Sequence, residues 1–334
     1  MSKIIITKES YEYLFNCSFY DQDRWWQEGI SNHYIGVIYF TVGVLFEMFY
    51  IPSMLAMLTE DMRKLSCYKI MLLITMTDMI VLTINAIFSG YQAFVGAVTC
   101  NYPLANYICG VIALTGWLIT GVACLLLSIN RIIDMLSPTL SDILFAGRKT
   151  YVWLLVPIIY GFLGGVLTNP PGFTSKQLAW YYDPHFGTKL PTTYIKPDYV
   201  NFLQVIHNLL VTSIIAIVYG TFCVIVSIKF KTTEKITLSD PRGSLFLQSF
   251  IICFVIFFTG VINAYMQYLP TPDFVVVIGH FLWILSHGIT SVILLILNKS
   301  IMKVIKKNFI PCLVKYEQGK TTMTKPILSS VKRI

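Results

Sequence analysis

The sequence from Pro103 to Ile129 is a long apolar run without a single charged residue. As an α-helix with a rise of 1.5 Å per residue, this run covers about 40 Å, more than the roughly 30 Å of hydrocarbon in a bilayer. We therefore expect a long, tilted transmembrane helix. It ends at Asn130 and Arg131, with Asp134 about one turn further on.

The composition of the whole chain agrees with a helical membrane protein. Only 13% of the 334 residues are charged, whereas soluble domains carry about 25%. Residues 1–16 lack the charged and apolar regions of a cleavable signal peptide, so we expect the first span to act as the insertion signal. No internal repeat of the kind found in transporters is visible.

The apolar segments predict an all-α membrane protein, folded as a seven-transmembrane helix bundle. The predicted spans are His33–Leu58, Tyr68–Tyr91, Pro103–Asp134, Tyr151–Asn169, Tyr199–Ile228, Ser244–Leu269 and Phe274–Leu297. Several glycines and Pro157 interrupt the fourth, which membrane helices tolerate when neighbouring helices satisfy the freed backbone groups. The chain then divides into an N-terminal segment (1–32), the bundle (33–298) and a tail (299–334).

The lysines and arginines predict the orientation of the bundle. Six of the 25 fall on the side of the N-terminus and nineteen on the other side. Because cytoplasmic loops carry the excess of basic residues, we expect the N-terminus outside and the tail in the cytoplasm. This distribution also accounts for the net charge of +8, so no nucleic-acid partner is expected.

Two features of the predicted outer side concern covalent modification. A glycosylation sequon begins at Asn16. The cysteines expected on this side are Cys17, Cys100 and Cys109, and one pair among them is expected to form a disulfide; the sequence leaves the pair open. The loop from Pro171 to Asp198 contains no cysteine.

The segment after the seventh span predicts an amphipathic helix. Between residues 301 and 309 the apolar side chains share one helical face and the lysines lie off it. Such a helix lies in the membrane interface and is attracted to anionic lipids of the inner leaflet. Cys312, just beyond it, is a candidate for palmitoylation, although an unmodified thiol fits equally well.

Acidic residues within the predicted spans are candidate functional positions. A charge at the centre of a membrane helix costs roughly 2.5–3.5 kcal/mol on insertion scales. Asp78 lies near the middle of the second span, with Asn85 two turns on, and Glu47 lies in the first span. One interpretation is a polar hub that relays rearrangements between helices. The alternative is a protonated carboxyl group hydrogen-bonded within the bundle.

Arg131 at the end of the third span also has two interpretations. As a switch, it would contact neighbouring helices differently in two states, as a signalling transition requires. The flanking Asn130 and Asp134 favour this interpretation. The alternative is a basic anchor at the membrane interface.

Helical spacing predicts a small-molecule pocket near the outer ends of the helices. Five turns before Arg131, the same face of the third span carries Ala113. Apolar walls with a few convergent polar groups are typical of ligand sites, although each residue could equally serve helix packing. The candidates are Ala113, Leu114, Trp117, Gln204, His207, Asn208, Asn263, Gln267, His280 and Trp283. The outer half of the third span contains no acidic residue, which argues against a cationic amine ligand.

Enzyme chemistry has no support in the sequence. There is no recognisable nucleophile–base pair, no glycine-rich phosphate loop and no metal-ligand spacing. We therefore expect no enzymatic activity, no metal site and no cofactor.

A set of scattered motifs resembles the nematode serpentine chemoreceptors of class T (Srt), a family of seven-transmembrane G-protein-coupled receptors. The similarity extends over about Tyr34–Lys307. The residues that carry it are Ser66 to Met71, Asp78, Cys100, Pro103, Asn130, Arg131, Phe145, Gly147, Trp153 to Pro157, Asp183, Pro184, His287, Gly288, Asn298 and Lys299.

The resemblance implies a chemosensory receptor in the plasma membrane, with many membrane passes, in the cilium of a sensory neuron. It implies three partners: a small-molecule odorant or pheromone-like ligand, a heterotrimeric G protein and the lipid bilayer. The residues expected to couple to the G protein are Asn130, Arg131, Asp134, Lys229, Lys231, Lys235 and Arg242.

Three patterns of rhodopsin-like receptors are missing. Asn130-Arg131-Ile132 replaces the acidic-Arg-Tyr triplet, the sixth span lacks Cys-Trp-x-Pro, and the seventh lacks Asn-Pro-x-x-Tyr. The activation mechanism is therefore expected to differ from theirs. The alternative function is a seven-span ligand-gated channel or transporter, for which intramembrane ionisable residues such as Asp78 and Glu47 offer thin support.

Overall fold

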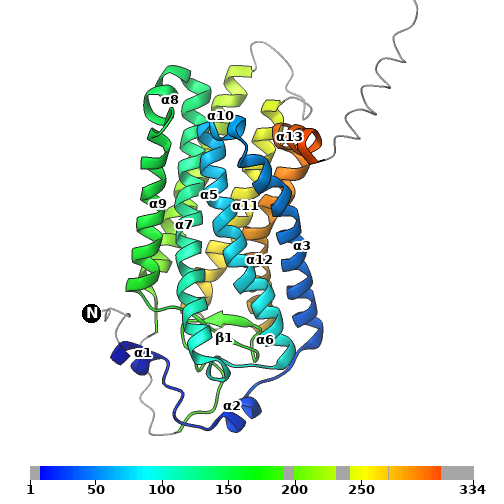
Figure 1. Ribbon diagram of the computed structural model, residues 1–334. Helices are drawn as coiled ribbons and strands as arrows, with labels where there is room; N and C mark the ends of the chain where they lie inside the picture. The colour runs from blue at the N-terminus through cyan, green and yellow to red at the C-terminus, as the bar shows by residue number, and fades with distance from the viewer. Residues whose placement is uncertain (1–7, 192–198, 231–240, 270, 310–334) are drawn as a thin grey trace, which may run out of the picture.

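The computed structural model of the chain describes residues 8–191, 199–230, 241–269 and 271–309. Within these ranges, seven long helical segments lie side by side in one bundle (Figure 1). They are α3 (His33–Met57), α5 (Ser66–Leu82) continuing through η1 (Thr83–Phe88) and α6 (Ser89–Val95), α7 (Pro103–Leu136), α9 (Lys149–Leu167), α10 (Phe202–Phe230), α11 (Pro241–Tyr268) and α12 (Asp273–Ile296). Each predicted span coincides with one of these segments.

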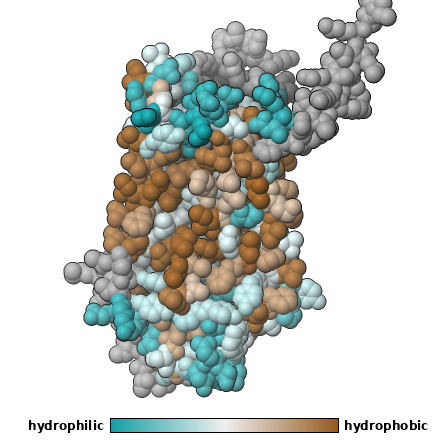
Figure 2. All heavy atoms as spheres, viewed as in Figure 1, coloured by the Kyte–Doolittle hydropathy of each residue, from teal (hydrophilic) through white to brown (hydrophobic). Residues whose placement is uncertain are grey.

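The surface of the bundle is that of a protein spanning a membrane several times. Five of the described helices are long and apolar enough to cross a bilayer, and α10 and α11 contain shorter apolar stretches, Phe202–Val218 and Phe254–Met266. Figure 2 shows a band of hydrophobic residues around the middle of the visible face, with hydrophilic residues at both ends. This is the pattern that lipid contact requires.

The longest helix, α7, packs against α5, α9 and α10. Its 34 residues correspond to about 51 Å, so it must tilt or extend beyond the hydrocarbon. The glycines of α9 allow the closest approach to it. A Cβ on Gly161 would lie 2.4 Å from Cγ1 of Ile119, and one on Gly165 would lie 1.9 Å from Oγ1 of Thr115. The interruptions of the fourth span are therefore the small-residue contacts by which membrane helices pack.

The second span differs from the expected straight helix. A π-helical segment, Thr83–Phe88, interrupts it between α5 and α6. Such segments shift the helical phase of all that follows and occur frequently at functional sites. Spacing along one ideal helix therefore does not predict which residues on either side of η1 share a face.

At one end of the bundle, which we call the hairpin end, short elements cover the helices (Figure 1). They are α1 (Lys8–Leu14), α2 (Gln22–Glu28), η2 (Thr99–Asn101) and the antiparallel strands β1 (Gly172–Thr174) and β2 (Ala179–Tyr181). Phe173 and Trp180 of the hairpin are buried, and Nε1 of Trp180 donates to Oγ of Ser89 on α6 at 2.7 Å. The bundle is helical as expected, and the short hairpin, whose strand β1 packs against α6, α7 and η2, was not predicted.

At the opposite end, which we call the tail end, lie α4 (Glu60–Arg63), α8 (Pro138–Phe145) and α13 (Lys299–Phe309) (Figure 1). The side chain of Asn298 accepts from the backbone N–H of Ile301 at 3.1 Å and so caps the start of α13. Ile301 and Ile305 are buried, and α13 packs on α3 and α12. The expected amphipathic helix therefore exists, with its apolar face turned to the bundle.

Candidate ligand-binding site

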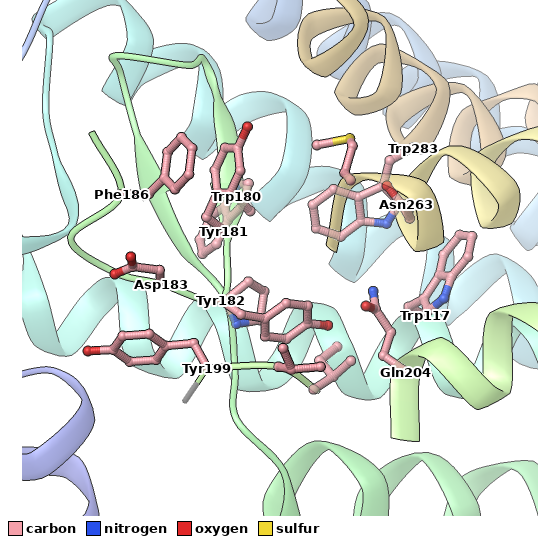
Figure 3. Close-up of a pocket in the computed structure, with 14 residues that line it drawn as sticks. Trp117, Trp180, Tyr181, Tyr182, Asp183, Phe186, Tyr199, Gln204, Asn263 and Trp283 are labelled. Carbon is pink, nitrogen blue, oxygen red and sulfur yellow. The ribbon is translucent and has the colours of Figure 1, made fainter. Parts of the chain in front are cut away.

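A cavity of about 320 Å³ lies at the hairpin end, between helices α7, α10, α11 and α12 and the loop that carries the hairpin (Figure 3). Its volume falls at the lower end of the range for small-molecule pockets. The residues that line it are Leu114, Trp117, Pro171, Trp180, Tyr181, Tyr182, Asp183, Phe186, Tyr199, Val200, Gln204, Asn263, Met266 and Trp283. Aromatic rings therefore make up half of the lining.

The polar groups of this cavity are few. In Figure 3 the Tyr182 hydroxyl and the Gln204 amide point toward each other. The hydroxyl is buried and has no hydrogen-bond partner within the described part of the chain. Burial raises the pKa of Tyr182 well above its usual value of 10, so this phenol stays a neutral hydrogen-bond donor.

Asp183 is the one charged residue in the described part of the lining, and it also organises its own loop. Its carboxylate accepts from the backbone N–H of His185 at 3.0 Å, and its carbonyl oxygen accepts from that of Phe186 at 3.1 Å. The cavity thus has an acid on the loop, although α7 supplies none. The described lining contains no lysine or arginine.

Five of the ten predicted pocket residues line this cavity, namely Leu114, Trp117, Gln204, Asn263 and Trp283. Ala113 is buried but lies off the lining. His207 and Asn208 line a smaller cavity instead, and His280 bonds to the carbonyl oxygen of Asn85 at 2.9 Å. The Gln267 side chain lies outside the described residues.

The loop before α10 supplies most of the lining that helical spacing did not predict. Eight lining residues come from this loop, and six of them have aromatic or acidic side chains: Trp180, Tyr181, Tyr182, Asp183, Phe186 and Tyr199. The available signal was the aromatic density of residues 180–186, which read WYYDPHF. Spacing within helices cannot predict that such a loop folds back over the bundle.

Below the cavity, Asp78 of α5 is completely buried and joins three other helices. Nδ1 of His287 lies 2.7 Å from its Oδ1, Oγ1 of Thr120 donates to the same oxygen at 3.1 Å, and the Tyr50 hydroxyl donates to Oδ2 at 2.8 Å. The Tyr50 hydroxyl also lies 2.6 Å from the carbonyl oxygen of His287. Asp78 thereby connects α5 to α3, α7 and α12.

The other two predicted hub residues do not bond to Asp78. Glu47 accepts from the Thr83 hydroxyl at 3.4 Å, on the edge of η1. Asn85 is buried, and neither its side-chain oxygen nor its nitrogen has a partner among the described residues. Asn85 lies within the π-helical turn, where the ideal helical spacing from Asp78 no longer applies.

At the tail end, three nearly consecutive residues of α5 each fasten a different neighbour. Ser66 accepts from Nδ2 of Asn130 on α7 at 3.1 Å, and the Tyr68 hydroxyl donates to Oδ1 of Asn298 at 3.2 Å. Nζ of Lys69 donates to the carbonyl oxygen of Gly147 in the turn before α9. Motifs that are scattered along the sequence therefore meet at this end of the bundle.

Arg131 follows Asn130 and is half-buried, whereas Asp134 is exposed. Arg131 lines a cavity of about 30 Å³ with Gln248 of α11 and Thr290 of α12. Within the described ranges, no hydrogen bond or ion pair of its guanidinium is found. The predicted coupling residues Lys231 and Lys235 lie outside the described residues, as do the side chains of Lys229 and Arg242 and the whole of Cys312.

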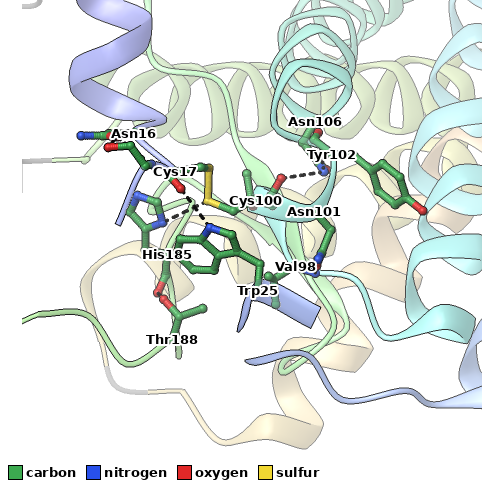
Figure 4. The surroundings of a disulfide bond; sticks show 12 residues. Asn16, Cys17, Trp25, Val98, Cys100, Asn101, Tyr102, Asn106, His185 and Thr188 are labelled. Carbon is green, nitrogen blue, oxygen red and sulfur yellow. Dashed lines mark hydrogen bonds between the residues drawn. A yellow bond between two sulfur atoms is a disulfide. The ribbon is translucent and has the colours of Figure 1, made fainter. Parts of the chain in front are cut away.

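A disulfide between Cys17 and Cys100 holds the N-terminal segment on the hairpin end (Figure 4). The sequence left this pair open; Cys109 is free. Trp25 is buried beside the disulfide, and its Nε1 donates to the carbonyl oxygen of Cys17 at 2.9 Å. Its ring stacks on that of His185, with centroids 5.9 Å apart.

Two further contacts involve this segment. Glu28 pairs with Lys176 of the hairpin turn at 2.8 Å and with Arg24 at 3.3 Å. The hydrogen bond from Lys176 lowers the pKa of Glu28 below its usual 4.5. The stabilisation from this pairing is therefore fully present above pH 4.5 and is lost only as the pH falls through the lowered pKa. Next to the disulfide, the side chain of Asn16 accepts from Ser18 within its own turn.

Comparison with known proteins gives the same family as the scattered motifs. The model of the family described as serpentine type 7TM GPCR chemoreceptor Srt matches residues 2–318. Serpentine receptor class T-55 of Caenorhabditis elegans is 25% identical over 289 residues, which cover 86% of this chain and 78% of that protein. The resemblance noted from the sequence is thereby confirmed, and the chain belongs to the Srt family of serpentine seven-transmembrane G-protein-coupled chemoreceptors.

Proposed function

We propose that this receptor binds a small organic molecule, an odorant or pheromone-like cue, in the hairpin-end cavity and activates a heterotrimeric G protein at the tail end. The observation that carries this proposal is the aromatic cavity of about 320 Å³. Trp117 of α7 lines it, and the same helix carries Arg131 at the opposite end of the bundle. One continuous helix therefore connects the two sites.

The lining favours a neutral, largely apolar ligand with a hydrogen-bonding group. Tyr182 offers an unpaired donor, and Gln204 and Asn263 bring amide groups to the cavity. Asp183 would repel a carboxylate, and the described lining holds no basic side chain to attract one.

The orientation proposed for the bundle places the hairpin end outside and the tail end in the cytoplasm of a sensory-neuron cilium. The excess of lysines and arginines in the segments that join the helices at the tail end supports it. The disulfide between Cys17 and Cys100 supports it as well, because disulfides form and persist outside the reducing cytosol. With this orientation Asn16 is a glycosylation site, and α13 lies at the inner leaflet.

At the tail end we propose Arg131 as the switch. Its guanidinium borders a small cavity shared with α11 and α12, so an outward movement of these helices would change its surroundings. Asn130 is held by Ser66, in a receptor that lacks an acid next to the arginine. We propose that this bond restrains the end of α7 in the resting state. Asp134, Lys229, Lys231, Lys235 and Arg242 would contribute to the surface that binds the G protein.

The test is a G-protein activation assay in cells that express the receptor, with and without a mixed odorant panel. We expect Arg131→Ala to reduce the response at least about tenfold, within the usual range of coupling energies, at unchanged surface expression. The matched control is Arg63→Ala, an exposed arginine of α4, which should respond like the wild type. An odorant-evoked current that persists in cells without G proteins would instead indicate a ligand-gated channel.

A further inference from the structure

Beneath the ligand cavity lies a second, much smaller one of about 10 Å³. Trp117 lines both, so its indole ring is the wall between them. The volume of the small cavity is close to the minimum that one water molecule needs. Its described lining is Trp117, Thr120, Gly121, His207, Asn208, Val211, Thr212, Ile256, Ser286 and His287.

Two buried polar atoms at this cavity have no hydrogen-bond partner among the described residues. They are Nδ2 of Asn208 and Nε2 of His287. The orientation of the Asn208 amide is fixed, because Nε1 of Trp117, which can only donate, lies 2.8 Å from its Oδ1. Nδ2 is therefore a free donor. On His287, Nδ1 faces Asp78 at 2.7 Å, which leaves Nε2 as the unpaired nitrogen.

The other polar side chains around the cavity already have partners. The Ser286 hydroxyl donates to the carbonyl oxygen of Trp283, that of Thr212 to the carbonyl oxygen of Asn208, and that of Thr120 to Asp78. His207 pairs through Nδ1 with the Tyr160 hydroxyl at 3.1 Å. The demand for a further hydrogen-bonding molecule therefore comes from Asn208 and His287.

We propose that this cavity binds one water molecule, which accepts a hydrogen bond from Nδ2 of Asn208 and donates one to Nε2 of His287. The water would complete a chain in which every member donates in the same direction. Trp117 donates to Asn208, Asn208 to the water, the water to His287, and His287 through Nδ1 to Asp78. The chain connects the wall of the ligand cavity to the carboxylate that joins four helices.

This chain of hydrogen bonds identifies Trp117 as the residue through which a ligand acts on Asp78. The consequence rests on the proposed function. A ligand that displaces the Trp117 ring would break its bond to Asn208. The Asn208 amide would then be free to rotate, and the water would lose its donor. His287, whose ring lies edge-on to Trp117 with centroids 5.8 Å apart, would change its hydrogen bonding at both nitrogens.

The test is ¹⁵N magnetic-resonance spectroscopy of histidine in the full-length receptor in lipid bilayers, without ligand. The chain has five histidines, so the His287 signals can be assigned by elimination from variants of the other four, with His287 itself intact. We expect a protonated Nδ1, and an unprotonated Nε2 with the shift of a hydrogen-bonded acceptor and a cross-peak to water. An Nε2 that is a free acceptor, or that carries a proton, would overturn the proposal.

A pair of variants tests the role of Asn208. Asn208→Leu should abolish the water cross-peak of His287, whereas Asn263→Leu, which changes an amide of the larger cavity only, should leave it intact. A cross-peak that survives Asn208→Leu would show that the water has a different partner. These spectra need neither ligand nor G protein, so their failure is distinguishable from a failure of the proposed receptor activity in the activation assay.

Discussion

Asp78 shows at the scale of one residue why a costly group is retained inside a membrane protein. Its side chain is fully buried, and each of its partners, Tyr50, Thr120 and His287, comes from a different helix. A buried carboxylate is tolerated when it is paired and hydrogen-bonded. The side chain therefore joins four helices, as expected both for a polar hub and for a carboxyl group hydrogen-bonded within the bundle, and the bundle should depend on this residue.

Removal of the Asp78 carboxylate should strongly destabilise the receptor. Asp78→Ala leaves His287, Tyr50 and Thr120 buried without their common partner, and breaking a buried pair in this way costs about 3–5 kcal/mol. We expect a clearly lower temperature of thermal inactivation in detergent, and partial recovery with Asp78→Asn.

Glu47 provides the matched control. It is also an acidic residue within a span, but among the described residues it accepts a single, long hydrogen bond, from the Thr83 hydroxyl at the edge of η1. Glu47→Ala should lower stability by no more than about 1 kcal/mol, as for an ordinary hydrogen bond. Equal losses for the two substitutions would contradict the assignment of Asp78 as the hub.

At the scale of the elements, glycines of α9 allow a close approach between α7 and α9. The space that a side chain at Gly165 would need is occupied by the Thr115 side chain of α7. Gly165→Leu should therefore force the helices apart and reduce the yield of folded receptor several-fold. Gly220→Leu on α10, where a Cβ meets nothing within 4 Å, should have little effect. Similar yields for both would show that the close approach is dispensable.

The attachment of the N-terminal segment to the hairpin end depends on the disulfide between Cys17 and Cys100. Cys100→Ser breaks the disulfide, which joins two residues 83 positions apart in the sequence. A disulfide typically stabilises the folded state by about 2–4 kcal/mol. We expect faster amide hydrogen exchange in residues 14–30, with the seven long helices unchanged. Cys109→Ser, which changes a free thiol, should leave exchange as in the wild type. Unchanged exchange in Cys100→Ser would mean that Trp25 and Glu28 suffice to hold the segment.

At the scale of the whole molecule, the positions of the helices could be predicted from the sequence and the covering of the pocket could not. An apolar run such as Pro103–Ile129 is long enough to cross a bilayer, so its length and composition predict a membrane helix without reference to the rest of the chain. All seven predicted spans therefore coincide with helices to within a few residues. Half of the predicted pocket residues line the cavity. Helical spacing alone accounts for Leu114 and Trp117, which it places on one face of the third span.

The remaining features depend on contacts between distant segments. The hairpin rests on Ser89 and Thr99, and the disulfide joins Cys17 to Cys100, pairings that no local pattern encodes. Asn85 lies in the π-helical turn and does not bond to Asp78, although the two residues are two turns apart in the sequence. Helical spacing did not predict Tyr182 and Asp183 as pocket residues, because the path of their loop depends on the surface against which it packs.

The central claim is that a ligand in the hairpin-end cavity controls a G protein at the far end of α7. The most direct measurement is ligand-dependent G-protein activation by the wild type, Leu114→Trp and Ile112→Trp at equal surface expression. Leu114 lines the cavity, whereas Ile112 lies two residues away on the exposed face of the same helix. Leu114→Trp should fill the cavity and abolish the ligand response, whereas Ile112→Trp should retain it. A full response from Leu114→Trp, with an unchanged ligand profile, would show that the ligand does not act from this cavity.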